Sequence, residues 1–194
     1  MSLHNSIEHA AIHLGLTYKD QSASAFGEVN GWLTQLSHTP PTGLENEGVS
    51  VVLQWGRPEV DDAVRRALAA DTSLEANGIA KDKVTIEDGC MVFPYRKRLF
   101  KADVTPQELV GMVESLGAVA RAGSATACRT CVTCGAVDGT PTLLNGSAHY
   151  VCDTCIDAIA SDSDAARTAH DAVPTHYVLA VAAAVVLCTV GAIS

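Results

Sequence analysis

Five cysteines gathered between residues 128 and 155 constrain this chain more than any other feature of its sequence. They stand in the stretch CRTCVTCGAVDGTPTLLNGSAHYVCDTC, with three cysteines in a first group and two in a second. A tetrahedral site takes four sulfur ligands, and two Cys-x-x-Cys pairs can supply them because both thiolates of a pair reach one ion at about 2.3 Å. One of the five cysteines must therefore lie outside such a site.

The second pair of ligands is unambiguous, whereas the first pair has two candidates that share the middle cysteine of the first group. Gly135 directly follows the later of these two pairs. A glycine there tolerates the positive φ that turns backbone amides toward the sulfur atoms. The predicted metal ligands are Cys131, Cys134, Cys152 and Cys155. Cys128 is the alternative ligand of the first pair.

The spacing CVTCG…CDTC resembles that of the zinc-ribbon family over about 30 residues. The resemblance implies a structural Zn²⁺ ion within residues 126–157, held by two Cys-x-x-Cys knuckles that a hairpin or loop connects. Four cysteine ligands leave no open coordination position for a water molecule. Catalysis by this metal is therefore not expected, and the ion is expected to stabilise a small module.

Other chemistries use similar cysteine patterns. A rubredoxin-type iron site has the same four-sulfur geometry. A bacterial ferredoxin motif would continue with a cysteine before a proline, where Asp138 and Gly139 stand here. A dithiol of Cys128 and Cys131 could cycle, but neither pair has the strand-then-helix context of a thioredoxin-like motif. His149 is interpreted as a strand residue. Zinc is the preferred prediction, and a redox or electron-transfer protein is the alternative.

The overall charge bears on the possible partners. The formal net charge is −9, which argues against nucleic-acid binding because a binder needs clustered Lys and Arg to displace phosphate counterions. The first residues, MSLHNSIEHAAIHLGL, contain no basic region followed by a long apolar run, so we expect no secretory signal. Synthesis in the cytosol would keep the thiols reduced and favour metal binding over disulfides.

The N-terminal part predicts an α+β domain over residues 22–122, a small antiparallel sheet with packed helices, preceded by a helix or tail over residues 1–21. The clearest element begins with Thr105, Pro106 and Glu108, which form the pattern of a capping box with proline in the first turn. The expected elements are helices over 5–16, 22–36, 58–77 and 105–120, a strand over 48–55, and a hairpin over 84–100 whose second strand, because of Pro94, is bulged or at an edge.

The order of these elements around LEANGIAKDKVTIEDGCMVFPYRKRLFKADVTPQEL resembles the YbjN and type III secretion chaperone-like fold, over about half of the chain. Members of that fold bind proteins, so the resemblance implies a non-enzymatic protein-binding role. A Ser/His/Asp constellation, a phosphate-binding loop and a dinucleotide fingerprint are all missing from the sequence. We therefore do not expect an enzyme.

The C-terminal stretch YVLAVAAAVVLCTVGAIS contains no charged residue. As a helix it would be about 25 Å long, close to the thickness of a bilayer core. We predict a transmembrane helix over residues 177–194, after an acidic spacer over residues 158–176, with the N-terminal domain and the zinc ribbon in the cytoplasm. This helix is predicted to be either a tail anchor or the first of several transmembrane helices, and we expect the second. The sequence thus predicts a membrane-anchored adaptor whose protein partner it does not identify.

Overall fold

The computed structural model describes residues 2–42, 46–96 and 104–161. The chain divides into one compact unit that ends at Cys152 and a second that begins at Asp153. Within the second unit, the described residues 153–161 form a helix. The first unit contains the sheet, its helices and a small separate hairpin.

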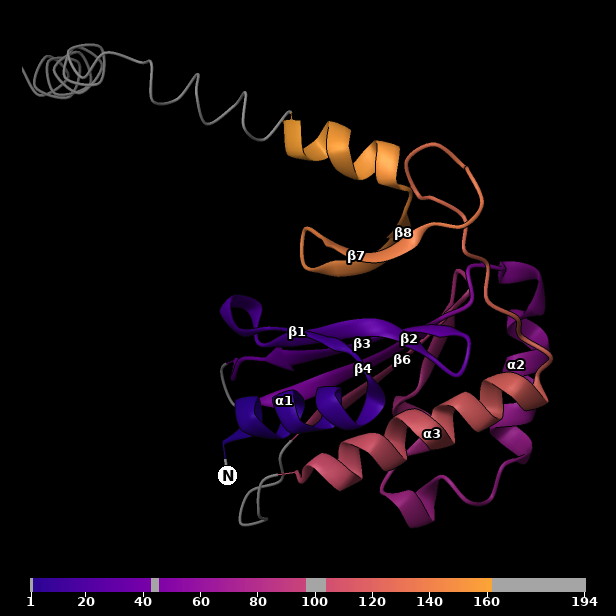
Figure 1. Ribbon diagram of the computed structural model, residues 1–194. Helices are drawn as coiled ribbons and strands as arrows, with labels where there is room; N and C mark the ends of the chain where they lie inside the picture. The colour runs from indigo at the N-terminus through magenta and orange to yellow at the C-terminus, as the bar shows by residue number, and fades with distance from the viewer. Residues whose placement is uncertain (1, 43–45, 97–103, 162–194) are drawn as a thin grey trace, which may run out of the picture. The chain divides into compact units, whose positions relative to one another are not determined.

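The first unit is built on a six-stranded sheet, followed in sequence by a two-stranded one (Figure 1). Every neighbouring pair of strands is antiparallel, in the order β1-β2-β3-β4-β6-β5 for the large sheet and β7-β8 for the small one. The main elements are α1 (Leu3–Leu14), β1 (Thr17–Lys19), β2 (Ser24–Val29), β3 (Trp32–Thr39), β4 (Gly48–Gln54), α2 (Asp61–Ala70), β5 (Thr85–Glu87), β6 (Cys90–Arg96), α3 (Pro106–Ala122), β7 (Thr140–Leu144) and β8 (Ser147–Val151). The α+β prediction with an antiparallel sheet is confirmed.

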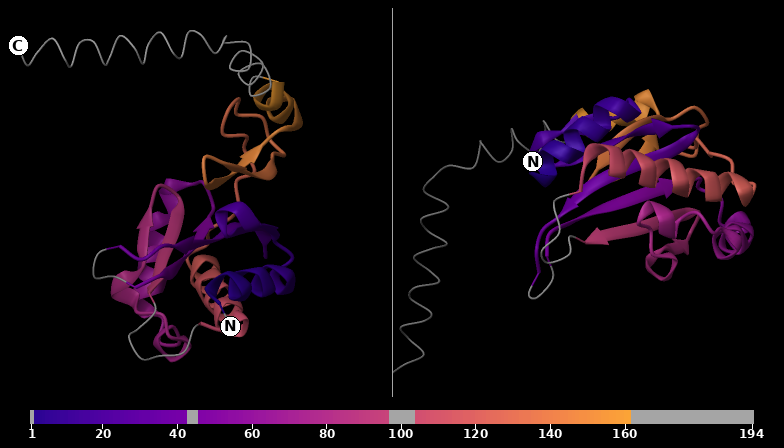
Figure 2. Two further views of the ribbon diagram at one scale, coloured as in Figure 1. Left: turned by 90° about the vertical axis from the view of Figure 1, so that its left-hand side faces the viewer. Right: turned by 90° about the horizontal axis from the view of Figure 1, so that it is seen from below.

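Helices α1 and α3 lie side by side on one face of the large sheet (Figure 2). This face holds the main core, to which β3, β4 and α3 each contribute fully buried side chains such as Leu36, Val51 and Leu116. The β7–β8 hairpin lies on the opposite face, over β2 and β3 (Figure 1). The sheet is therefore buried on both faces where β2 and β3 run.

The predicted helix over residues 22–36 is wrong, because this segment forms the β2–β3 hairpin. The turn is Asn30–Gly31, with φ of 52° and 87°, the pair of positive values that a two-residue type I′ turn requires. Apolar residues point to both sides of these strands, so Phe26 and Leu33 face the small hairpin while Val29 and Leu36 face the main core. A strand buried on both faces lacks the alternation of apolar and polar residues that marks a half-buried strand. The apolar residues that remain here happen to have the spacing of a helix.

The predicted helix over residues 58–77 is shorter than expected. Pro58 begins a single 3-10 turn that leads into α2, as its place in a first turn predicts, but α2 ends at Ala70. Asp71 ends it by accepting hydrogen bonds from the backbone N–H groups of Ser73 and Leu74. A short polar side chain that bonds the backbone ahead of it favours a turn over continued helix.

The other predicted elements of the domain are confirmed over the described residues, and residues 97–100 of the predicted hairpin lie outside them. The helix that begins after Thr105 carries the full capping box, since Thr105 Oγ1 accepts from Glu108 N–H and the Glu108 carboxylate accepts from Thr105 N–H. Helix α1 and strand β4 match the predictions over residues 5–16 and 48–55. Pro94 lies on β6 beyond the last residue paired with β5, so within the described residues β6 has one neighbour there. Pro94 is tolerated at this position because proline has no backbone N–H to donate to a strand on the other side.

A glycine inside α3 and the glycine that caps its C-terminus give a paired prediction about stability. A Cβ atom added to Gly111 would meet nothing within 4 Å, whereas at Gly123 it would lie 2.6 Å from Val64 Cα. Gly111→Ala should therefore stabilise the fold by about 0.5–1 kcal/mol, because glycine disfavours a helix interior. Gly123→Ala should destabilise it, because the backbone of α2 must move away. Urea unfolding of both variants tests this, and a loss of stability in Gly111→Ala would contradict it.

The remaining predictions for the C-terminal part fall on residues that the structure does not describe. The transmembrane helix over residues 177–194 and most of the spacer over 158–176 lie outside the described ranges. Among residues 2–42, 46–96 and 104–161, no helix has the length and apolar character needed to cross a membrane.

Candidate metal centre

The loop before β7, the end of β8 and the helix after it present the predicted ligands. Cys131 and Cys134 lie in the loop, Cys152 directly follows β8, and Cys155 lies in the helix at residues 153–161. The loop turns at Gly135, whose φ is 77° and whose N–H donates to the Cys131 carbonyl at 2.9 Å. The positive φ predicted for this glycine is confirmed, and it brings the two loop cysteines to the same side of the turn.

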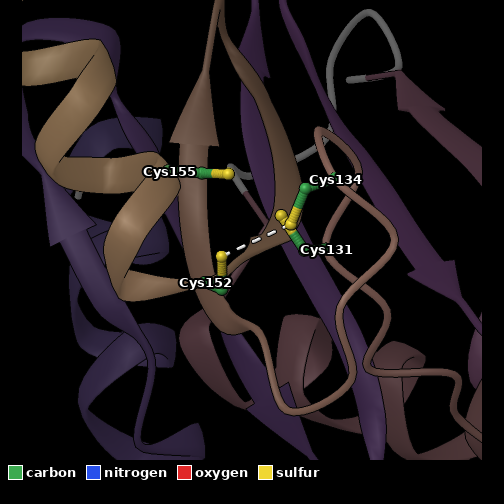
Figure 3. A group of neighbouring side chains, drawn as sticks. All are labelled: Cys131, Cys134, Cys152 and Cys155. Atoms are coloured by element: carbon green, nitrogen blue, oxygen red, sulfur yellow. Dashed lines mark hydrogen bonds between the residues drawn. The ribbon is translucent and has the colours of Figure 1, made fainter.

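The four sulfur atoms lie within 4.8 Å of one another (Figure 3). The separation between Cys134 Sγ and Cys152 Sγ is 3.6 Å, close to the edge of about 3.8 Å that a tetrahedron of sulfurs 2.3 Å from a central ion would have. This arrangement fits a single metal ion of a kind that thiolates bind. The coarse prediction, a four-cysteine cluster beside a hairpin, is confirmed, and the identity of the ion stays a prediction.

No family model, curated protein or solved structure matches this chain. The resemblances to zinc ribbons and to the YbjN and type III secretion chaperone-like fold therefore stay predictions. What is known of the site comes from its own geometry.

Cys131 is the most enclosed of the four cysteines, with 2% of its surface exposed. The backbone N–H groups of Cys152, Cys134 and Thr133 donate to its sulfur and lower the pKa of the thiol from 9.0 to about 6. Hydrogen bonds to the charged form favour that form. The thiolate is the form that binds a metal. These hydrogen bonds therefore favour the metal-binding form of Cys131.

Cys128 is absent from the cluster, in agreement with its role as the spare cysteine. Its sulfur lies 2.9 Å from Thr130 Oγ1, and its backbone N–H donates to the Trp55 carbonyl at 3.0 Å. The contact with Thr130, aided by Arg57, lowers the pKa of the Cys128 thiol. His149, the other residue considered near the second pair, pairs with Thr142 in the hairpin and is not part of the cluster.

Two glutamines tie the hairpin to the sheet. The buried Gln35 side chain donates from Nε2 to the Gly146 carbonyl at 2.7 Å and accepts the Ala148 N–H at Oε1, at 2.8 Å. Gln54 Nε2 donates to the Ala148 carbonyl at 3.1 Å. These amides thus pair with backbone groups of β8 and of the turn before it, much as a neighbouring strand would. Sequence reasoning missed both residues, because their partners are about a hundred positions away.

A second attachment joins the hairpin to Glu28 on β2. One Glu28 carboxylate oxygen accepts from Arg129, and the other accepts from the Tyr150 hydroxyl at 3.2 Å. Burial and the Glu28 charge raise the pKa of Tyr150 to about 12. Arg129 precedes the cysteine cluster and Tyr150 lies on β8. Glu28 therefore holds both the loop that leads into the hairpin and the second strand of the hairpin.

Alkaline pH should weaken the fold through Tyr150. Its pKa rises from 10.0 to about 12 on folding, so its contribution is complete below pH 10 and is lost as the pH rises to 12. At roughly 1.4 kcal/mol per pKa unit, reduced for partial solvent screening, this amounts to about 1–2 kcal/mol. Urea unfolding at pH 9 and pH 11.5 should show a smaller loss in Tyr150→Phe than in the unmodified protein. Equal losses would contradict the prediction.

Proposed function

We propose that this protein is a non-enzymatic protein-binding adaptor whose β7–β8 hairpin is held together by one structural zinc ion. The observation that carries the proposal is the convergence of four cysteine sulfurs within 4.8 Å. Zinc suits a tetrahedral set of four thiolates and has no redox chemistry of its own. A closed set of four protein ligands supplies folding energy and leaves no position for a substrate.

Protein binding is supported by the surface next to the cluster and by the order of the elements. Val132 and Val137, both in the loop that carries the first two cysteines, are 57% and 75% exposed. Exposed apolar side chains that lie close together in the chain suit a protein contact. The order of one helix, an antiparallel meander, a second helix, a hairpin and a third helix is compatible with the protein-binding fold that the sequence resembles. In the proposal, residues 177–194 attach the adaptor to a membrane.

Metal analysis of the purified full chain tests the first part of the proposal. We expect about one zinc ion per chain and no visible absorption, as a closed four-thiolate zinc site requires. An iron content near one ion per chain, with visible absorption, would support the electron-transfer alternative. Substantially less than one metal ion per chain, with the four thiols reactive, would refute the metal site.

Site-specific photo-crosslinking in the native host tests the second part. A photoreactive residue at Val137 should give crosslinks of defined mass, whereas one at Ile12, which is 70% exposed on α1, serves as a matched control. The crosslinks at Val137 should disappear in Cys152→Ser and persist in Cys90→Ser, because Cys90 lies on β6 outside the cluster. Identical crosslinks from both positions would argue against a binding surface at the loop.

A further inference from the structure

The contact between the β7–β8 hairpin and the large sheet is small and separate from the main core. Four buried residues form it, Phe26 and Leu33 on the sheet and Ala148 and Tyr150 on the hairpin, with Leu143 packed against them. Complete burial of a large apolar side chain is worth only about 1.5–3 kcal/mol. The apolar part of this contact can therefore supply only a few side chains' worth of stabilisation.

Ordering the hairpin opposes this gain. Fixing the backbone costs roughly 1–2 kcal/mol for each residue, and a two-stranded hairpin alone is marginally stable at best. A hollow of about 200 Å³, partly open to solvent, also borders this contact and is lined among others by Leu33, Trp55, His149 and Tyr150. Solvent therefore reaches one border of the contact, where the close packing of a protein interior is not attained.

The metal centre lies at the base of the hairpin, where a bound ion can add to the small stabilisation that the contact with the sheet provides. Cys131 and Cys134 precede β7, and Cys152 directly follows β8, so one ion connects the two ends of the hairpin at its base. The Val132 N–H also donates to the Tyr150 carbonyl at 2.9 Å, which aligns the loop with β8. A crosslink that closes a loop stabilises it by reducing the freedom of the open state.

From these observations we infer that metal binding controls whether the β2–β3 face of the sheet is exposed. With the metal bound, the hairpin covers Phe26 and Leu33. When the metal is lost, the hairpin detaches and the rest of the domain stays folded. The inference rests on the metal site of the proposed function. The main domain can remain folded because its core on the opposite face of the sheet, between the strands and helices α1 and α3, contains none of the hairpin residues. Detachment would uncover an apolar face together with Gln35 and Gln54, whose amides both bind the backbone of Ala148 on β8.

Hydroxyl-radical footprinting of the full chain, with and without its metal, tests the inference. Metal is removed with EDTA in the presence of a phosphine reductant and then restored with zinc. Phe26 and Tyr150 are each 6% exposed, and removal of the metal should raise their oxidation rates roughly tenfold, in proportion to the surface that local opening uncovers. Phe93, which is 3% exposed in the main core, should stay protected, and zinc should restore the original pattern.

Two cysteine variants show whether the exposure of Phe26 comes from loss of the metal or from an effect of the chelator on the rest of the chain. Cys152→Ser should show the exposed pattern without any chelator, whereas Cys90→Ser should behave like the unmodified protein. Unchanged protection of Phe26 in the metal-free protein would overturn the inference, and so would equal loss of protection at Phe26 and Phe93, which indicates global unfolding. A chain that is purified without metal would refute the proposed function instead, so the two failures are distinguishable.

Discussion

Cys134→Ser is expected to abolish stable metal binding, whereas Cys128→Ser is expected to leave it intact. Cys134 Sγ lies 3.6 Å from Cys152 Sγ inside the four-sulfur cluster, and Cys128 lies outside it. Changing a group that merely orients a metal ligand costs about 10–100-fold in affinity. Loss of a ligand itself should therefore weaken binding by more than about 100-fold.

Competition with a chromogenic chelator measures this difference, and metal content after gel filtration provides a second readout. Cys128→Ser is a closely matched control, since it makes the same chemical change in the same loop, six residues earlier in the chain. The opposite pattern, with metal lost in Cys128→Ser and kept in Cys134→Ser, would show that the first ligand pair is Cys128 and Cys131. Loss in both variants would mean that the contact between Cys128 and Thr130 is itself needed to shape the loop.

Asp61→Ala should destabilise the domain by about 1–3 kcal/mol, because it leaves the Gly89 N–H without its partner and takes one of two acceptors from Trp55 Nε1, which also donates to the Arg57 carbonyl. Asp61 is 5% exposed at the start of α2. Its Oδ1 accepts from Trp55 Nε1 at 3.0 Å, and its Oδ2 accepts from the Gly89 N–H at 3.2 Å. One carboxylate therefore joins the end of β4, the turn between β5 and β6, and the first turn of α2.

The neighbouring aspartate provides the control for this variant. Asp62 is exposed and pairs with Arg65 on the surface, so Asp62→Ala should cost at most about 1 kcal/mol. Asp61→Asn should fall between the two, because an amide can accept only one of the two hydrogen bonds without turning its NH₂ group toward a donor. Urea unfolding followed by tryptophan fluorescence measures all three. Equal effects of Asp61→Ala and Asp62→Ala would refute the bridging role.

The parts of this protein that could be predicted from the sequence are those whose causes are local. The capping box at Thr105 and the positive φ at Gly135 each depend on residues within a few positions. The grouping of four cysteines follows from the reach of each Cys-x-x-Cys pair. Such features leave a signature in a short stretch of sequence, and the structure has them where the sequence predicts them.

The parts that could not be predicted depend on distant partners. Residues 22–36 form strands because one face packs on helices and the other on a hairpin more than a hundred residues later. The Asn30–Gly31 pair is a local hairpin signal that the predicted helix overlooked. The role of Gln35 is equally hidden, since an isolated glutamine gives no sign that its amide will bind backbone groups of a later hairpin.

The distance along the chain between the sheet and its cover also has a consequence during synthesis. Gln35 and Ala148, which bond to each other, are separated by 113 positions. At a translation rate of about 5–20 residues per second, β2 and β3 precede the hairpin by on the order of ten seconds. On the ribosome the nascent chain therefore displays Phe26 and Leu33 to its surroundings throughout that interval. A chaperone or a ribosome-associated partner has access to this face before the hairpin exists.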